Sequence, residues 1–141
     1  MPWAQGLVAL DALLAVLLYF FMAARVGAAR NKYKVDAPAT TGDPVFERTF
    51  RVHQNTLEQL PPFLVGLYFF SSTLNPLTAA VIGLVWIIGR IIYMESYIAN
   101  PSSRRLGALL TFLPTAILVV GGIVGVGMAV LRDLPHGTGL F

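Results

Sequence analysis

Two long stretches of this chain contain no charged side chain, and they limit what the chain can fold into. One stretch runs from Gln59 to Gly89, and the other runs from Leu106 to Leu131. Uncharged runs of this length exceed ordinary core helices and reach the roughly 20 residues that cross the hydrocarbon core of a bilayer. The sequence therefore predicts an integral membrane protein.

The overall composition and the pattern of the apolar runs support helices in a membrane. Hydrophobic residues make up 56% of the 141 residues and charged residues only 12%, whereas soluble domains contain about 25% charged residues. The runs are continuous, which favours helices over a barrel, because barrel strands alternate apolar and polar residues. The first apolar run is too long for a signal peptide and lacks its basic start, so we expect a retained span.

We predict an all-α fold, a four-helix bundle with up-down-up-down topology that forms a single transmembrane domain over residues 1–141. Short connections between the spans favour neighbouring antiparallel helices. Asp43 and Asn100 are predicted N-caps, each followed by proline at the first helical position. A polar loop is expected over residues 30–44. The predicted spans cover about residues 3–24, 44–70, 77–99 and 101–131.

Basic residues gather in two of the three connections and predict the orientation of the chain. The first loop contains Arg30, Lys32 and Lys34, and the third connection contains Arg104 and Arg105. Because loops rich in Lys and Arg stay in the cytoplasm, these two connections should be cytoplasmic and both termini should lie on the other side. The net charge of +3 follows this placement, so we expect no nucleic-acid partner. The short chain favours a bacterial inner membrane.

A stripe of polar residues occupies the first half of the second span. At about 100° per residue its members fall within one arc of about 100°, and charges at this depth usually face a bundle interior or a wet cavity. The alternative is that the arginines extend to the headgroups while Arg51 pairs with Glu58 to hold helices together, which leaves Asn55 unexplained. The members of the stripe are Arg48, Arg51, Asn55, Glu58 and Gln59.

The third span has a second polar face, formed by Arg90, Tyr93 and Tyr97 at i, i+3 and i+7. Tyrosines near a membrane interface often belong only to the aromatic belt. A charge within a span needs a partner, however. Glu58 on the second span is the partner that we expect for Arg90.

Arg104 and Arg105 begin the fourth span, where their charges could serve only to orient the chain. Beside the amides of a helix N-terminus, a cation such as Arg104 would also stabilise an anion, and a thiolate is one. The chain contains no cysteine, so a reacting thiol would have to come from a substrate. No metal site is predicted, because His53 and His136 are too few and too far apart.

The stretch FERTFRVHQNTLEQLPPFL resembles the signature of the MAPEG family, the membrane-associated proteins in eicosanoid and glutathione metabolism. The pattern is Phe-Glu-Arg followed by Arg51, Asn55 and Glu58, running into a proline. The likeness extends to PATTGDPVFER in front of it, and to GRIIYMESY and SSRR behind it. It is strongest toward the microsomal glutathione transferase and cysteinyl-leukotriene synthase branch.

This resemblance implies a homotrimer of four-helix subunits, with glutathione as co-substrate bound between neighbouring subunits on the cytoplasmic side. Arginines suit the two carboxylates of the tripeptide, and a glutamate suits its amine. Arg104 would be the catalytic residue, which stabilises the glutathione thiolate. The residues that the resemblance assigns to glutathione binding are Arg30, Arg51, Asn55, Glu58, Tyr93 and Tyr97.

Three residues depart from that branch of the family. Asn31 stands where a second arginine often follows Arg30, Gln59 stands where a tyrosine is frequent, and His53 stands where glutamine or another polar residue is common. These departures concern the electrophile side of the site. Asn31 in particular removes a candidate second catalytic group.

The sequence therefore predicts a membrane-bound glutathione transferase that conjugates the glutathione thiolate to lipophilic electrophiles from the bilayer, in a detoxification role. Glutathione peroxidase activity on lipid hydroperoxides is a further activity that the same chemistry allows. The alternative is a non-catalytic lipid-binding or scaffold protein of the same fold, which would not need the whole tripeptide site. A small transporter or channel needs polar residues through the bilayer, and the fourth span supplies none.

Overall fold

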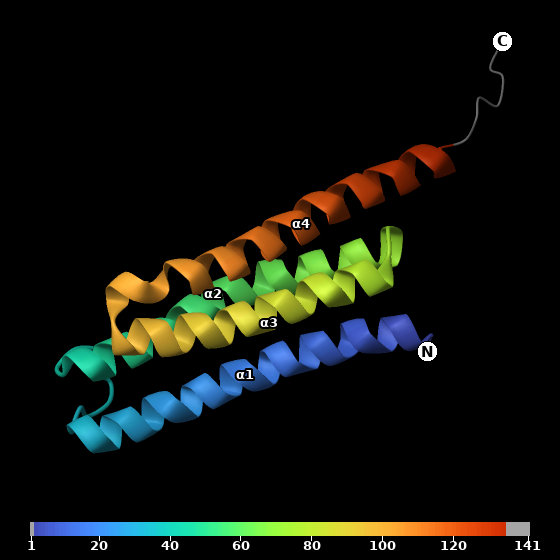
Figure 1. Cartoon of the computed structure of the whole chain (residues 1–141). Coiled ribbons are helices and arrows are strands. Elements are labelled where there is room, and N and C mark those ends of the chain that lie inside the picture. The colour runs from blue at the N-terminus through green and yellow to red at the C-terminus, as the bar shows by residue number, and fades with distance from the viewer. Residues whose placement is uncertain (1, 135–141) are drawn as a thin grey trace, which may run out of the picture.

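The structure is a computed structural model that describes residues 2–134, and these residues form a bundle of long helices without a strand (Figure 1). Successive helices run in opposite directions, so the α1–α2 and α3–α4 connections share one end of the bundle. The predicted all-α, up-down-up-down fold is confirmed for the described residues. The elements are α1 (Trp3–Tyr33), α2 (Pro44–Thr73), α3 (Pro76–Ala99), the short 3₁₀ helix η1 (Pro101–Arg104) and α4 (Arg105–Asp133).

The two predicted N-caps are confirmed. The carboxylate of Asp43 accepts hydrogen bonds from the backbone N–H groups of Val45 at 2.8 Å and Phe46 at 3.2 Å. Asn100 caps η1 in the same way, and each cap is followed by proline at the first helical position. These caps satisfy N–H groups that have no partner within the helix. They fix where the chain enters α2 and η1, at the end of the bundle that contains the two basic connections.

Several boundaries differ from the prediction. The first span was expected to end near residue 24, and the third was expected to start at residue 77, whereas α3 starts at Pro76. The polar loop was expected to start at Arg30, but α1 continues to Tyr33 and ends at Lys34 in the left-handed conformation. Basic residues in the last turn favour this extension, because they interact well with the C-terminal end of the helix dipole. α2 runs on to Thr73, and the fourth helix opens with the 3₁₀ turn, so that α4 itself starts at Arg105.

Three of the four long helices are apolar and long enough to cross a membrane: α1, α3, and the helical segment Pro101–Asp133. Their outward faces are apolar, as a lipid environment requires. On α1, for example, Leu13, Leu17 and Phe20 are each more than 60% exposed. The protein is therefore an integral membrane protein.

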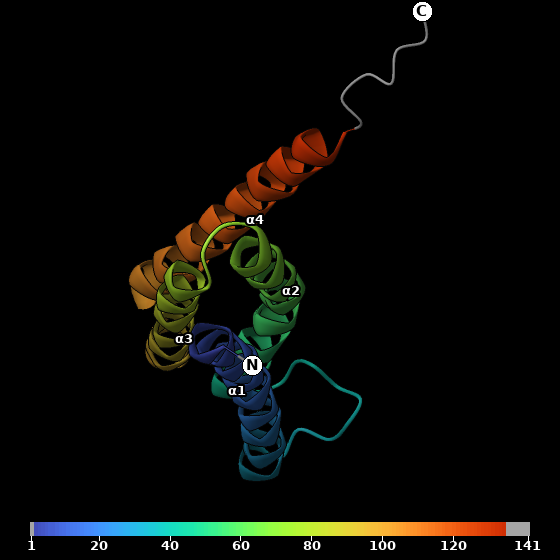
Figure 2. The same cartoon turned by 90° about the vertical axis from the view of Figure 1, so that its right-hand side faces the viewer.

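α2 is less apolar than the other three helices, because its first half contains the polar stripe. It nevertheless packs against α1, α3 and α4, whereas α4 lies on the far side of the bundle from α1 (Figure 2). Because α2 packs along all three of these helices, we expect it to cross the bilayer with them. The crossing of α2 and the cytoplasmic orientation of the two basic connections stay predictions.

Core packing and one close glycine contact hold the helices together. Phe63 of α2 stacks on Trp86 of α3, with ring centroids 4.1 Å apart, and both side chains are buried. Nearer the connections, Gly107 of α4 lies directly against the backbone of Tyr93 in α3. A Cβ at position 107 would come within 2.4 Å of the Tyr93 backbone. Only glycine allows α3 and α4 to approach this closely.

Substituting Gly107→Ala should therefore destabilise the protein by about 3 kcal/mol, the upper part of the range for overpacked sites, because a helix backbone would have to move. Gly127→Ala is the matched control on the same helix, since a Cβ at that position meets nothing within 4 Å. That control should gain up to about 1 kcal/mol from helix propensity. Thermal unfolding in detergent measures both changes, and equal changes in the two variants would contradict the close α3–α4 approach.

Candidate functional site

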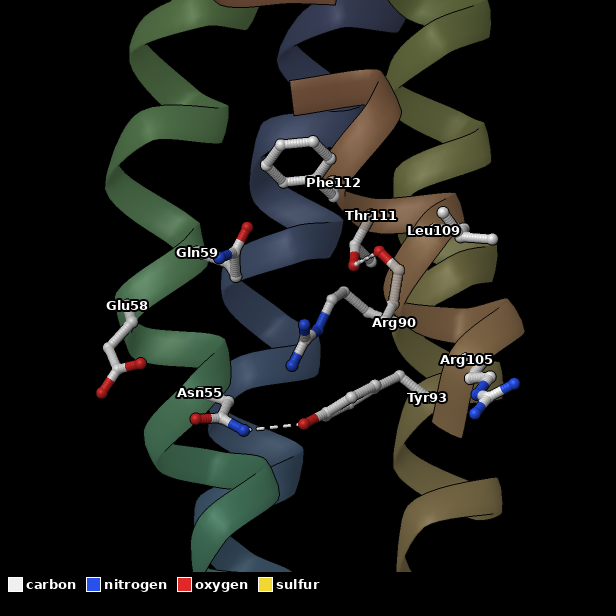
Figure 3. A pocket seen from close by; sticks show the side chains of 10 residues that line it. Asn55, Glu58, Gln59, Arg90, Tyr93, Arg105, Leu109, Thr111 and Phe112 are labelled. Carbon is white, nitrogen blue, oxygen red and sulfur yellow. Dashed lines mark hydrogen bonds between the residues drawn. The ribbon is translucent and has the colours of Figure 1, made fainter. Parts of the chain in front are cut away.

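The polar stripe of α2 meets the second half of α3 at the end of the bundle that contains the basic connections. Asn55 donates a hydrogen bond from Nδ2 to the Tyr93 hydroxyl oxygen at 2.7 Å, which joins the two helices directly (Figure 3). Arg51 and Glu58 of the stripe line a hollow together with Tyr97 of α3. Five of the seven residues predicted for the site thus come together on two helices: Arg51, Asn55, Glu58, Tyr93 and Tyr97.

The first of two hollows, here called the interhelix hollow, lies among α2, α3 and α4 (Figure 3). Its volume is about 610 Å³, within the range of roughly 300–1,000 Å³ for small-molecule sites. Amide, hydroxyl and guanidinium groups form one part of its wall, and apolar side chains of α4 form the other. Its lining includes Asn55, Glu58, Arg90, Tyr93, Arg105 and Phe112.

The second hollow, here called the mouth hollow, lies closer to the basic connections and has a volume of about 570 Å³. Two arginines of α2 and hydroxyl groups from the α1–α2 loop and α3 give it donors for an anion. Glu58 borders both hollows, so one carboxylate stands between them. The lining of the mouth hollow includes Thr40, Arg48, Arg51, Gln54, Glu58 and Tyr97.

Arg90 is buried in the bundle, with only 2% of its surface exposed. The predicted pairing with Glu58 is wrong, because Arg90 donates from Nη2 to the Thr56 hydroxyl oxygen at 2.8 Å. Glu58 lies on the exposed side of α2, and its carboxylate points away from Arg90 (Figure 3). The alternative pair of Arg51 with Glu58 is not formed either. Within residues 2–134 the ion pair that is formed joins Arg25 and Glu95.

The tyrosines of α3 form a stacked pair that leads toward α4. The Tyr93 and Tyr97 ring centroids are 5.6 Å apart and the rings are tilted by only 6°. Tyr93 is buried, so it is not an aromatic-belt residue. The Arg104 guanidinium carbon lies 5.4 Å from the Tyr97 ring centroid. Arg104 was expected to begin the fourth helix, but it is the last residue of η1, directly before α4.

Arg30 is the predicted site residue that a single chain does not bring to the others. Its Nη1 donates to the backbone carbonyl oxygen of Ala39 at 2.7 Å, and its guanidinium lies over the Phe46 ring.

Sequence reasoning missed Thr56, because a hydroxyl group within an apolar stretch gives no sign that it meets a charge. It also left Arg105 with no role beyond orientation, yet Arg105 lines the interhelix hollow.

No group of three or more His, Cys, Asp or Glu side chains that could hold a metal ion occurs in the part of the chain that the structure describes. His53 stacks on Tyr19 of α1, with ring centroids 4.6 Å apart. His136 lies outside the described residues.

Lipid-facing helices with a cluster of polar side chains at one end define the class of this protein, a helical membrane protein with a candidate polar site at the bilayer edge. The model of the MAPEG family matches residues 8–124, so the chain belongs to the MAPEG family. It is 46% identical over 118 residues to the uncharacterized protein sll1147 of Synechocystis, covering 84% of this chain and 86% of that protein. It is 37% identical over 127 residues to human microsomal glutathione S-transferase 2, covering 90% and 86%. It is 37% identical over 104 residues to bovine leukotriene C4 synthase, covering 74% and 69%.

Tyr93→Phe should cost about 1 kcal/mol of stability in the absence of ligand, because the variant loses the oxygen that accepts the Asn55 hydrogen bond. Tyr97→Phe is the matched control in the same stacked pair, since the Tyr97 hydroxyl group makes no hydrogen bond within the described residues. Its stability should change by less than about 0.5 kcal/mol. Unfolding in detergent distinguishes the two, and an equal loss in both variants would contradict the Asn55–Tyr93 link.

Proposed function

We propose that this protein is a membrane-bound glutathione transferase that conjugates the glutathione thiolate to lipophilic electrophiles. One observation supports the proposal above all: Arg51, Asn55, Glu58 and the two stacked tyrosines converge on two adjoining hollows. The relatives named microsomal glutathione S-transferase 2 and leukotriene C4 synthase support the same class of reaction.

The charges of the two hollows match those of the tripeptide. Glutathione has two carboxylates and one amine, and guanidinium groups bind carboxylates through paired hydrogen bonds. Arg51, with Arg48 beside it, would bind a carboxylate in the mouth hollow, and Glu58 would bind the amine. Asn55, Tyr93 and Tyr97 would position the rest of the peptide. A lipid alone would not require this combination of charges.

Arg104 would activate the thiol. A cysteine thiol has a pKa of about 8.5, so free glutathione is mostly protonated at neutral pH. A guanidinium at the N-terminal end of α4 would stabilise the thiolate and lower that pKa. Lowering it by two units corresponds to about 2.7 kcal/mol of interaction. In a substitution, the sulfur would form a bond to the electrophilic carbon while the leaving group departs with the electron pair of the broken bond. In an addition, the π electrons would move to the neighbouring atom, which then takes a proton from water.

The electrophile would enter from the bilayer through the apolar wall of the interhelix hollow. Leu109 and Phe112 of α4 line that hollow and are also 54% and 63% exposed, so their surfaces would connect lipid with the site.

The same thiolate could reduce a lipid hydroperoxide, with a second glutathione completing the disulfide. This would be the peroxidase side activity.

We also propose that the site is completed in a homotrimer. Arg30 lies over Phe46 and lines neither hollow in its own subunit. A neighbouring copy would supply its Arg30 to the site, so that glutathione binds between subunits. With the two basic connections in the cytoplasm, this site would open to cytoplasmic glutathione, in an inner membrane if the protein is bacterial.

Arg104→Ala should abolish the ultraviolet absorbance of bound thiolate when glutathione is added to the detergent-purified protein at neutral pH. It should lower kcat/KM toward a model electrophile about 100-fold, the equivalent of two pKa units, while glutathione still binds. Arg132→Ala, at the far end of α4, is the control and should leave both unchanged.

Two results would count against thiol activation by Arg104, and a third would count against the transferase itself. A thiolate signal that persists in Arg104→Ala would mean that a different group activates the thiol. Bound glutathione without a thiolate signal in the wild type would mean weak activation. Failure of the wild type to bind glutathione at all would favour the lipid-binding or scaffold protein instead.

A further inference from the structure

Arg90 is a buried charge that the proposed mechanism does not use. Its Nε atom is buried without a hydrogen-bond partner, and its Nη2 atom reaches only the neutral hydroxyl group of Thr56. No carboxylate forms an ion pair with it in the described part of the chain. A guanidinium in this position costs free energy unless other groups compensate for its lost hydration. Its presence in the bundle interior therefore needs an explanation.

The compensation comes from an aromatic ring. The guanidinium carbon of Arg90 lies 4.4 Å from the Tyr93 ring centroid, a distance typical of a cation–π contact. Tyr93 in turn is stacked on Tyr97, and Tyr97 lies under the guanidinium of Arg104. These four side chains form a continuous cation–ring–ring–cation stack, which leads from the bundle interior to the start of α4.

The side chains of this stack become more exposed from Arg90 to Arg104. Arg90 and Tyr93 are buried, Tyr97 is half-buried, and Arg104 is exposed. Arg90 is tied to α2 through Thr56, and Tyr93 is tied to α2 through Asn55. Within residues 2–134, the Arg104 guanidinium contacts the Tyr97 ring and forms no hydrogen bond or ion pair. The placement of the Arg104 guanidinium therefore depends on rings whose own position is fixed from the buried end.

We infer that Arg90 is a positioning residue, the buried anchor of a four-member stack that presents the Arg104 guanidinium to the reacting sulfur. The inference rests on the proposed function and adds to it a residue that acts through Arg104 instead of on the reacting atoms. It explains why a charge is retained in the bundle interior without an acidic partner. It also explains why the three residues of α3 share one helical face.

The test compares Arg90→Met and Arg90→Lys in the full-length protein, with Arg25→Met as the control. Methionine fills the buried space without a charge. Lysine keeps the charge and a donor for Thr56 but lacks the flat guanidinium group that stacks on a ring. Arg25 belongs to the exposed ion pair with Glu95 at the same end of the bundle, so its replacement controls for general loss of positive charge.

The first measurement needs no glutathione. Phenylglyoxal modifies exposed arginines, and Arg104 and Arg105 are neighbouring exposed residues, so peptide mass spectrometry gives their relative rates. In the wild type, Arg104 should react about threefold more slowly than Arg105, the effect expected of an exposed cation–π contact. In both Arg90 variants the two rates should become equal. An unchanged ratio would overturn the inference, whatever the protein does with glutathione.

The second measurement is the thiolate absorbance of bound glutathione across pH. Both Arg90 variants should still bind glutathione, but their thiolate signal and the pH profile of kcat/KM should move to higher pH. If Arg90→Lys restores the wild-type profile, the buried charge acts on its own and the stack is not the reason. A wild type without any thiolate signal would refute the proposed function, while the modification rates would still decide the positioning role.

A third variant keeps the test decisive if the Arg90 variants do not assemble. Thr56→Val leaves the charge in place and removes the hydrogen bond that ties it to α2. It should raise the relative modification rate of Arg104 in the same direction. A Thr56→Val protein that matches the wild type in both measurements would overturn the inference.

Discussion

The buried guanidinium of Arg90 is the constraint on which the arrangement of the site depends. A charge removed from water costs several kcal/mol unless hydrogen bonds or other charges compensate. Here a hydroxyl group of α2 and a tyrosine ring of α3 do so. The Thr56 hydrogen bond joins α3 to α2, so it holds the two helices in the register at which Asn55 meets Tyr93. The polar side chains of two helices that we propose to bind the ligand are thus aligned by an interaction that lies deeper in the bundle.

The rest of the fold keeps this alignment at the polar end of a lipid-facing bundle. The Asp43 and Asn100 caps fix where α2 and η1 begin, and Gly107 lets α4 approach the Tyr93 backbone. The opposite half of the bundle packs apolar side chains such as the Phe63–Trp86 pair. A polar ligand and an apolar co-substrate can therefore approach the same residues from water and from lipid.

Local signals in the sequence predicted most of the fold and much of the site. The lengths of the apolar runs predicted the helices. The Asp43-Pro44 and Asn100-Pro101 pairs predicted where two helical segments begin, and helical periodicity predicted the shared face of the α2 stripe. Contacts between residues far apart in the sequence were harder to predict. Arg90 was assigned a carboxylate, because charge complementarity is visible in a sequence whereas a lone hydroxyl group such as Thr56 is not. Arg30 was grouped with the others by resemblance, and the single chain separates it from them.

The central claim is that the polar end of the bundle binds glutathione as a thiolate, and the proton released on binding tests this most directly. Isothermal titration calorimetry of glutathione at neutral pH, in two buffers with different ionisation enthalpies, counts that proton. We predict release of about 0.7 proton at pH 7, because lowering the thiol pKa from about 8.5 by two units converts most of the bound thiol to thiolate. S-methylglutathione, which has no thiol, should bind and release none. Equal heats in both buffers for glutathione, or equal proton release for the two ligands, would contradict the account.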